Sequence, residues 1–287
     1  MGILLQTVIN GIMLGSVYAM VALGLTLIYG ILNVPNFAHG TLYMIGAYFA
    51  YFAIVSFGAS YWVALFVSMA LLFVAGILLE RIVFRPFYDK PLINSFIVAV
   101  GLILVLENTA LSLWGPEFRQ FSGPSEKVIK IMGVMITMQR VIVILTAAVM
   151  IWLVHLFIKK TRLGAAIEAT SQNPDGALLM GINISHMRSI TFGIGTALAA
   201  VAAVLVAPIL LIYPAMGQTV IGMAFVIIIV GGMGSFIGAV LGGYIIGLLE
   251  TIVTSYVTNF FTEAIIFGLL VILLAVKPTG LFGKSHG

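Results

Sequence analysis

Few side chains in this 287-residue sequence are of the types that catalyse reactions. Both aspartates, Asp89 and Asp175, lie among other charged residues, which excludes a catalytic aspartate pair inside an apolar segment. The chain has no cysteine, and its four histidines are too widely spaced to form a recognisable zinc motif. These histidines are His39, His155, His186 and His286. We therefore predict no catalytic residue and no metal site, and an intramembrane enzyme is the least favoured class.

One segment imitates a phosphate-binding loop. Residues 278–285 read Pro-Thr-Gly-Leu-Phe-Gly-Lys-Ser, but proline stands where such a loop requires its first glycine. Only two residues follow the segment, so the helix that would receive the phosphates is missing. The sequence therefore predicts no nucleotide site in this chain.

Two carboxylates, Glu107 and Glu250, lie well inside apolar runs. An ionisable group costs free energy at membrane depth and is by default a candidate for function. Hydroxyl or amide groups that could partner each carboxylate follow it directly in the sequence, at Asn108 and Thr251. We hypothesise that both carboxylates lie on a transport path, and the alternative is a structural network or a site near the lipid headgroups.

The composition indicates the elements that must hold these residues. Hydrophobic residues make up 62% of the chain and charged residues 8%, against about 25% charged in soluble domains. The first charged residue is Glu80, so the preceding stretch far exceeds the roughly 20 apolar residues of one helical span. Long runs of Leu, Ile, Val, Ala and Gly favour helices over the alternating strands of an outer-membrane barrel. We predict an all-α polytopic protein of an inner or plasma membrane.

Charged clusters and polar breaks divide the chain into roughly 8 to 9 transmembrane helices. Two breaks, residues 33–40 and 58–60, split the charge-free beginning into three apolar runs. Pro35 disfavours helical geometry within the first break, which either reaches water or stays embedded under a cover of protein. The later spans are expected near Leu92–Leu113, Val141–Ile158, Ser189–Ile212, Thr219–Val230, Phe236–Val257 and Ala264–Val276.

The distribution of basic residues predicts the orientation. Residues 80–90, residues 159–188 and the C-terminus fall on one side of the membrane and carry nine of the 13 Lys and Arg residues. Basic residues concentrate in cytoplasmic loops, so this side is predicted to be cytoplasmic. The net charge of +4 belongs to these loops and suits contact with anionic lipid, not with nucleic acid.

Glycines recur at intervals of four residues, which predicts close packing between helices. The spaced glycines are Gly11 with Gly15, Gly234 with Gly238 and Gly242, and Gly243 with Gly247.

A short, well-marked helix is predicted inside the loop of residues 159–188. Asn173 is a good N-cap, Pro174 and Asp175 suit the first turn, and Gly181 can end the helix. Its apolar residues Ala177, Leu178 and Met180 form a contact surface. This surface implies a protein partner, and the alternative is a helix lying on lipid.

The chain resembles the LivH-type permease subunits of ABC importers for branched-chain amino acids. The resemblance covers nearly the whole chain and rests on the order and spacing of several motifs. They are Asn10-Gly11, Leu14–Ser16, Ala22–Gly30, Asn36–Gly40, Arg162–Gly164, Asn173–Asn183, Gly231–Ser235 with Gly238-Ala239, and Pro278–Gly283.

The resemblance implies one transmembrane permease domain over residues 1–287, type II-like, with broken helices and inverted repeats around the substrate path. Asn33, Asn36 and His39 would lie at one such break. It further implies that residues 163–183 hold a coupling helix that docks into an ATPase, with Glu168 and residues 176–181 in the contact region. The expected partners are a second homologous permease, two ATPase subunits that bind ATP and Mg, and an extracytoplasmic amino-acid-binding protein.

The expected function is therefore ATP-driven import of branched-chain or related hydrophobic amino acids by alternating access. A proton-coupled secondary transporter of small amphipathic solutes is the main alternative, because Glu107 and Glu250 could carry protons. It leaves the capped helix at Asn173 unexplained. A channel or scaffold without energy input would account only for the glycine packing.

Overall fold

A computed structural model describes residues 2–32, 34–88, 90–131, 134–257 and 260–282. In this part of the chain, six helices are long and apolar enough to cross a membrane, and three apolar helices are shorter. They are α1 (Gly2–Leu32), α2 (His39–Val55), α3 (Tyr61–Leu79), α4 (Leu92–Trp114), α5 (Met138–Lys160), α8 (Ile184–Val206), α9 (Met216–Gly231), α10 (Phe236–Tyr256) and α11 (Thr262–Val276). The short ones are α2, α9 and α11. The predicted all-α membrane fold is confirmed, while the count of 8 to 9 crossings stays a prediction.

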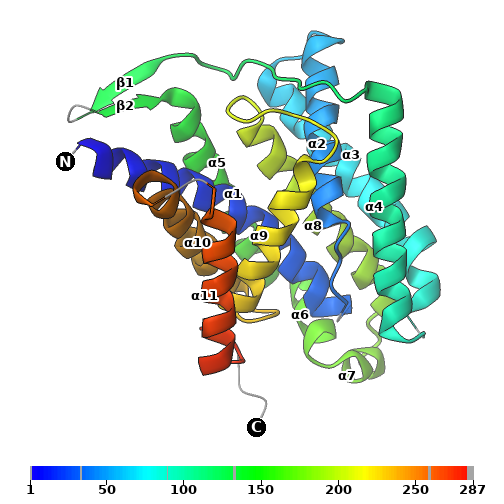
Figure 1. The fold of residues 1–287 in the computed structure, drawn as a ribbon. Helices are drawn as coiled ribbons and strands as arrows, with labels where there is room; N and C mark the ends of the chain where they lie inside the picture. Colours follow the sequence, from blue (N-terminus) through cyan, green and yellow to red (C-terminus); the bar gives the residue numbers. More distant parts are fainter. Residues whose placement is uncertain (1, 33, 89, 132–133, 258–259, 283–287) are drawn as a thin grey trace.

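The connecting elements gather at two opposite ends of the helices (Figure 1). One end, here called the hairpin end, carries the antiparallel strands β1 (Val128–Ile131) and β2 (Val134–Thr137). The other, the α7 end, carries the short helices α6 (Arg162–Gln172) and α7 (Pro174–Leu179) and the end of α11. Two of the regions predicted to share a side of the membrane, the loop of residues 159–188 and the segment that follows α11, therefore begin at the same end, while residues 283–287 lie outside the described residues.

Two stretches of the chain, α1–α4 and α8–α11, here called the first and second halves, begin with helices that run in opposite directions. α1 runs from the hairpin end to the α7 end, whereas α8 runs the other way (Figure 1). Each is followed by a break and a short helix, α2 after α1 and α9 after α8. The halves meet backbone to backbone, because Gly24 packs on the Gly195 carbonyl and Gly40 on the Gly217 carbonyl. This is the arrangement expected of the inverted repeats that the resemblance implies, with α5, α6 and α7 between the two halves.

The first break is embedded in protein. Asn36 forms a tight turn just before α2, where its Oδ1 accepts a hydrogen bond from the Ala38 amide at 3.1 Å. Val34, Asn36 and Ala38 are buried, so non-helical backbone is covered by protein as a membrane requires. α2 then starts part-way between the two ends (Figure 1). The sequence had left open whether this segment reaches water.

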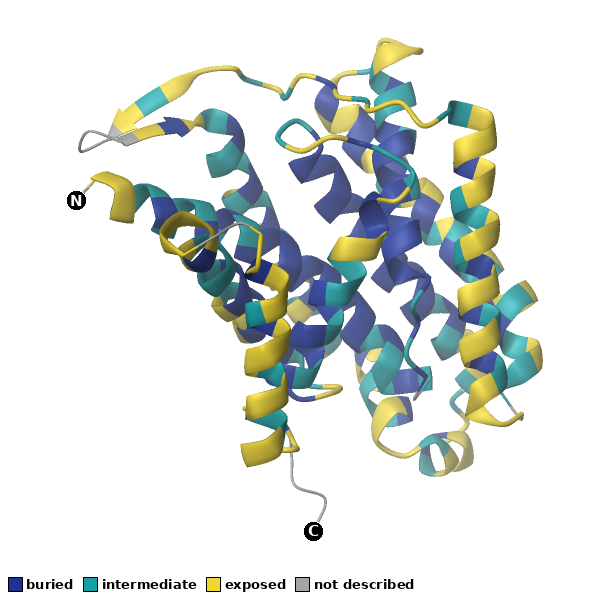
Figure 2. Cartoon of the chain, viewed as in Figure 1, coloured by how far each residue is buried: buried dark blue, intermediate teal, exposed yellow. Residues whose placement is uncertain are grey.

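Small residues allow the central helices to pack closely. Figure 2 shows buried residues concentrated in α1 and α8, while α4 and α11 are largely exposed. Gly15 and Gly247 face one another where α1 crosses α10, which confirms the packing role predicted for them. Gly234 instead has a φ of 79° and forms the turn before α10. The outer helices expose many large apolar side chains, as a surface in contact with lipid or other membrane proteins does.

The structure differs from the prediction at the start of α8 and in two further elements. α8 begins at Ile184, earlier than the predicted start near Ser189, because the Asn183 side chain caps it by accepting from the His186 amide at 3.0 Å. The helix α6 and the β-hairpin were not predicted.

Candidate functional site

The break before α2 places two of the predicted path residues in the protein interior. Asn36 and His39 are 1% and 0% exposed, whereas Asn33 lies outside the described residues. The His39 ring faces α1, where a Cβ atom on Gly24 would lie 3.2 Å from its Nε2. Among the described residues, neither ring nitrogen has a partner with good hydrogen-bond geometry, nor does Asn36 Nδ2. The break therefore holds buried polar groups with unused hydrogen-bonding capacity.

An aromatic cluster connects the break to α4 and α9. The Phe37 ring stacks on Phe225 of α9, with centroids 4.3 Å apart, and meets Phe96 of α4 edge to face at 5.2 Å. We call Phe37, Phe96 and Phe225 the aromatic cluster. Such pairs are favourable beyond their apolar area, and this one fixes the break against both helices.

Nearer the hairpin end, the same two helices carry a polar pair. Gln218 Nε2 of α9 donates to Glu107 Oε2 of α4 at 2.9 Å. Glu107 is half-buried and Gln218 is exposed, while Glu107 Oε1 is buried without a hydrogen-bond partner among the described residues. We call the surface formed by this pair and the aromatic cluster the α4–α9 seam. It combines a carboxylate with an apolar aromatic lining.

Glu250 lies apart from Glu107. It projects from α10, where the Tyr18 hydroxyl of α1 lies within hydrogen-bonding reach of its carboxylate. α4 and α10 lie on opposite sides of the molecule (Figure 1), so the two carboxylates do not form one site.

The helix predicted at Asn173 is present as α7. Asn173 Oδ1 accepts from the Gly176 amide at 2.8 Å, Pro174 opens the helix, and Gly181 follows it with a φ of 78°. Glu168 of α6 pairs with Lys159 at 2.8 Å. Ala177 is buried, so the exposed apolar surface consists of Leu178, Leu179 and Met180. These three side chains are 59%, 88% and 82% exposed, more than a solvated helix end requires.

Comparison with known proteins identifies the family. Residues 7–275 match the family model described as branched-chain amino acid transport system / permease component. The chain belongs to this family. It is therefore a multi-pass membrane permease component, and the resemblance seen in the sequence is confirmed.

Three similar proteins align with this chain over nearly the full length of both partners. One is the high-affinity branched-chain amino acid transport system permease protein LivH of Escherichia coli K12, 35% identical over 299 residues, with 98% of this chain and 96% of the relative covered. BraD of Pseudomonas aeruginosa, with the same description, is 32% identical over 296 residues, with the same coverage. A probable LivH of Methanocaldococcus jannaschii is 29% identical over 293 residues, covering 96% and 91%. No solved structure matches the chain.

Two glycine motifs of this permease meet in the structure. Gly232 and Gly234 form the turn between α9 and α10 with positive φ. Gly280, from the segment that imitates a phosphate-binding loop, packs against that turn, and the Leu281 amide donates to the Val230 carbonyl at 2.7 Å. These contacts hold Gly280 and Leu281 against the end of α9.

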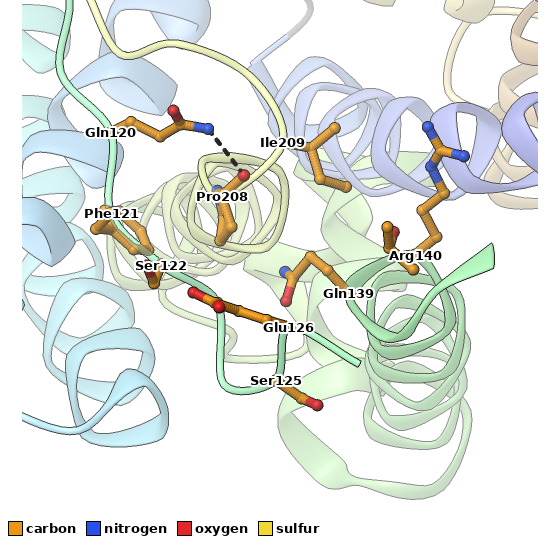
Figure 3. Close-up of a pocket in the computed structure, with 11 residues that line it drawn as sticks. Gln120, Phe121, Ser122, Ser125, Glu126, Gln139, Arg140, Pro208 and Ile209 are labelled. Carbon is orange, nitrogen blue, oxygen red and sulfur yellow. Dashed lines mark hydrogen bonds between the residues drawn. The ribbon is translucent and has the colours of Figure 1, made fainter. Parts of the chain in front are cut away.

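Sequence reasoning did not find a polar cavity of about 490 Å³ at the hairpin end of this permease. Figure 3 shows its lining, which includes Gln120, Glu126 and Gln139. Gln139 is buried, and its amide donates to the Tyr61 hydroxyl at 3.2 Å and the Leu205 carbonyl at 2.8 Å. Its Oε1 has no partner among the described residues and lies against Gly123. The only sequence signal was a glutamine at the start of an apolar run.

Proposed function

We propose that this permease is the transmembrane subunit of an ATP-driven importer that moves branched-chain or related hydrophobic amino acids into the cell by alternating access. The observation that carries the proposal is α7, a capped helix that exposes Leu178, Leu179 and Met180 at the end of the molecule with most of the basic residues. An ATPase groove would bury this surface. Membership of the family supports the substrate class.

The proposed complex contains a second homologous permease, two ATPase subunits and an extracytoplasmic amino-acid-binding protein. ATP and Mg would bind to the ATPase subunits, which leaves this chain as a transport subunit without catalytic residues. The predicted excess of basic residues makes the α7 end cytoplasmic and the hairpin end, with its polar cavity, extracytoplasmic.

The α4–α9 seam is the proposed path surface of this subunit. Glu107 and Gln218 offer a carboxylate and an amide that suit the charged groups of an amino acid, and the aromatic cluster offers an apolar surface for its side chain. A path must release its substrate, so a weak site of this kind is expected, with the binding protein providing most of the affinity. Asn33, Asn36, His39 and Glu250 remain path candidates.

The test is to purify the tagged permease from its host in mild detergent, identify co-purifying chains and reconstitute the complex in vesicles. Recovery of an ATPase pair and a second permease, with uptake that requires ATP, is the expected result. A homo-oligomer whose uptake follows an imposed proton gradient would instead support the secondary transporter, with Glu107 and Glu250 as proton carriers. A control without the binding protein should show little uptake.

A further inference from the structure

A buried carboxylate lies where α3 meets α8. Glu80 is 0% exposed, although the sequence places it in a charged loop. Arg85 donates to its two oxygens at 3.3 and 2.9 Å, and the Tyr88 hydroxyl donates at 3.1 Å. Ser189 of α8 donates at 2.5 Å. Four donated hydrogen bonds therefore surround one carboxylate.

The same residues hold the first turns of α8 from several directions. Arg85 donates to the Ser189 hydroxyl at 2.7 Å and to the Ser185 carbonyl at 3.3 Å. The Arg188 guanidinium lies 4.5 Å from the centre of the Tyr88 ring. Burial and the Glu80 carboxylate raise the pKa of the Tyr88 hydroxyl, so it remains a donor. We call Glu80, Arg85, Tyr88 and Ser189 the Glu80 joint.

The joint is close to α7 along the chain. α7 ends at Leu179 and α8 begins at Ile184, with a tight turn between them that the Ile182 amide closes onto the Ala177 carbonyl at 3.0 Å. A displacement of α7 would therefore act on the start of α8 through this short connection. Glu80 and Arg85 belong to the first half of the molecule, so the joint transfers such a displacement from α8 to α3 and the α3–α4 connection.

Stability alone does not explain this arrangement. Burying the Glu80 carboxylate costs desolvation free energy that a pair with Arg85, whose side chain is 37% exposed, often does not recover, and apolar replacements of such pairs are often as stable. Glu80 also begins a π-helical turn, Glu80–Phe84. Such turns are rare in proteins overall, and those that occur often lie at functional sites. Elsewhere, α3 and α8 are joined by a simpler bond, from the Thr196 hydroxyl to the Leu72 carbonyl at 2.7 Å. The ionic joint is confined to the α7 end.

We infer that the Glu80 joint is the positioning element that transmits the movement of α7 to the first half of the permease. The inference rests on the proposed ATP-driven function. Glu80→Gln keeps the shape of the side chain and removes its charge, and Ser189→Ala removes the bond that crosses between the halves. Substitution of Arg85 is unsuitable, because it would leave a buried charge unpaired and threaten folding.

The experiment measures uptake and ATP hydrolysis separately in vesicles that contain the complete complex. In Ser189→Ala and Glu80→Gln, amino acid uptake per ATP hydrolysed should fall about tenfold, the loss expected for one hydrogen bond to a charged group. ATP hydrolysis should persist, because the ATPase contact of α7 is unchanged. Ser189→Thr keeps a hydroxyl and should restore the ratio. The double variant, Glu80→Gln with Ser189→Ala, should reduce uptake per ATP by less than the two single reductions multiplied together, because both residues act in one network.

Thr196→Ala is the matched control, since it removes a buried bond between the same two helices outside the joint. Its uptake per ATP should equal that of the wild type. A wild-type ratio in Ser189→Ala and Glu80→Gln would overturn the inference, and so would a proportional loss of uptake and ATP hydrolysis. If the wild-type complex itself shows no ATP-driven uptake, the proposed function fails instead. Should Glu80→Gln not assemble, Ser189→Ala alone decides.

Discussion

Glu107 and Glu250 both lie within apolar helices, yet their carboxylates have different neighbours. Glu107 meets an exposed glutamine at the α4–α9 seam, whereas Glu250 lies beside the buried Tyr18 hydroxyl. The first environment resembles a surface that substrate or a partner chain contacts. The second resembles a bond between helices.

We predict that Glu107→Gln lowers amino acid uptake by about tenfold, since an uncharged amide would replace the carboxylate in the proposed charge-assisted contact with substrate. Uptake of labelled leucine into vesicles measures the effect. Asn108→Ala is the control, because the neighbouring Asn108 side chain is exposed and donates within its own helix, to the Leu104 carbonyl at 2.7 Å. Wild-type uptake in Glu107→Gln would reject the path role of Glu107.

Glu250→Gln is also predicted to impair uptake, and the thermal stability of the variant separates two causes. Lower uptake with an unchanged melting temperature indicates a carboxylate on the path. A lower melting temperature indicates that the contact between Glu250 and Tyr18 holds α10 to α1.

A functional role for an individual residue could be predicted from the sequence only where the residue differed in kind from its neighbours along the chain. Glu107 stood out as a carboxylate in an apolar run, but Gln218, its partner, is 111 residues away. Glu80 stood among other charges and gave no sign of burial, because the serine that helps to bury it is 109 residues away. Such pairs are produced by tertiary packing, which local sequence patterns do not record.

At the scale of helices, α2 and α9 can cross closely because Gly40 and Gly217 have no side chains at the contact. A Cβ atom on Gly40 would lie 2.2 Å from the Gly217 carbonyl oxygen, so Gly40→Ala must push the helices apart. We expect it to destabilise the permease by about 1–3 kcal/mol, as overpacked cores do. The melting temperature in detergent measures this. Gly101→Ala is the control, because nothing lies within 4 Å of its Cβ position, and an equal loss in both variants would contradict the prediction.

The cap of α7 supplies a second prediction for an element. Gly176→Pro removes the amide that donates to Asn173 and disfavours helical geometry at Asp175. ATP hydrolysis should then proceed without matching uptake, because the proposed coupling helix no longer presents Leu178 and Met180. Gly176→Ala retains the amide and should remain coupled. Normal coupling in Gly176→Pro would argue against α7 as the contact with the ATPase.

Most apolar helices could be predicted from run length and breaks, because each apolar run has to be nearly long enough to cross a bilayer. α4 and α5 lie close to the predicted spans. The start of α8 was missed because a basic residue, Arg188, indicated a loop, whereas its guanidinium lies over the Tyr88 ring. The direction of the two halves could not be deduced from hydropathy.

For the whole molecule, the orientation can be tested directly, because the chain has no cysteine to interfere with labelling. Met180→Cys and Glu126→Cys place single exposed thiols at the α7 end and the hairpin end. A membrane-impermeant maleimide added to intact cells, with the outer membrane permeabilised where there is one, should label Glu126→Cys. It should label Met180→Cys only after the cells are opened. The reverse pattern would show that the predicted orientation is wrong.

The contacts of α1 with helices late in the chain also bear on how the protein is made. Ser16 of α1 bonds the Tyr244 hydroxyl of α10, which is 228 residues further along the chain. During synthesis, α1 enters the bilayer long before α8 and α10 exist, so its glycine-lined faces first meet lipid or the insertion machinery. The mature contacts form only when the last third of the chain arrives. We therefore expect biogenesis of this permease to end with a rearrangement of helices already in the membrane, and truncation before α10 should leave α1 a target for quality-control proteases.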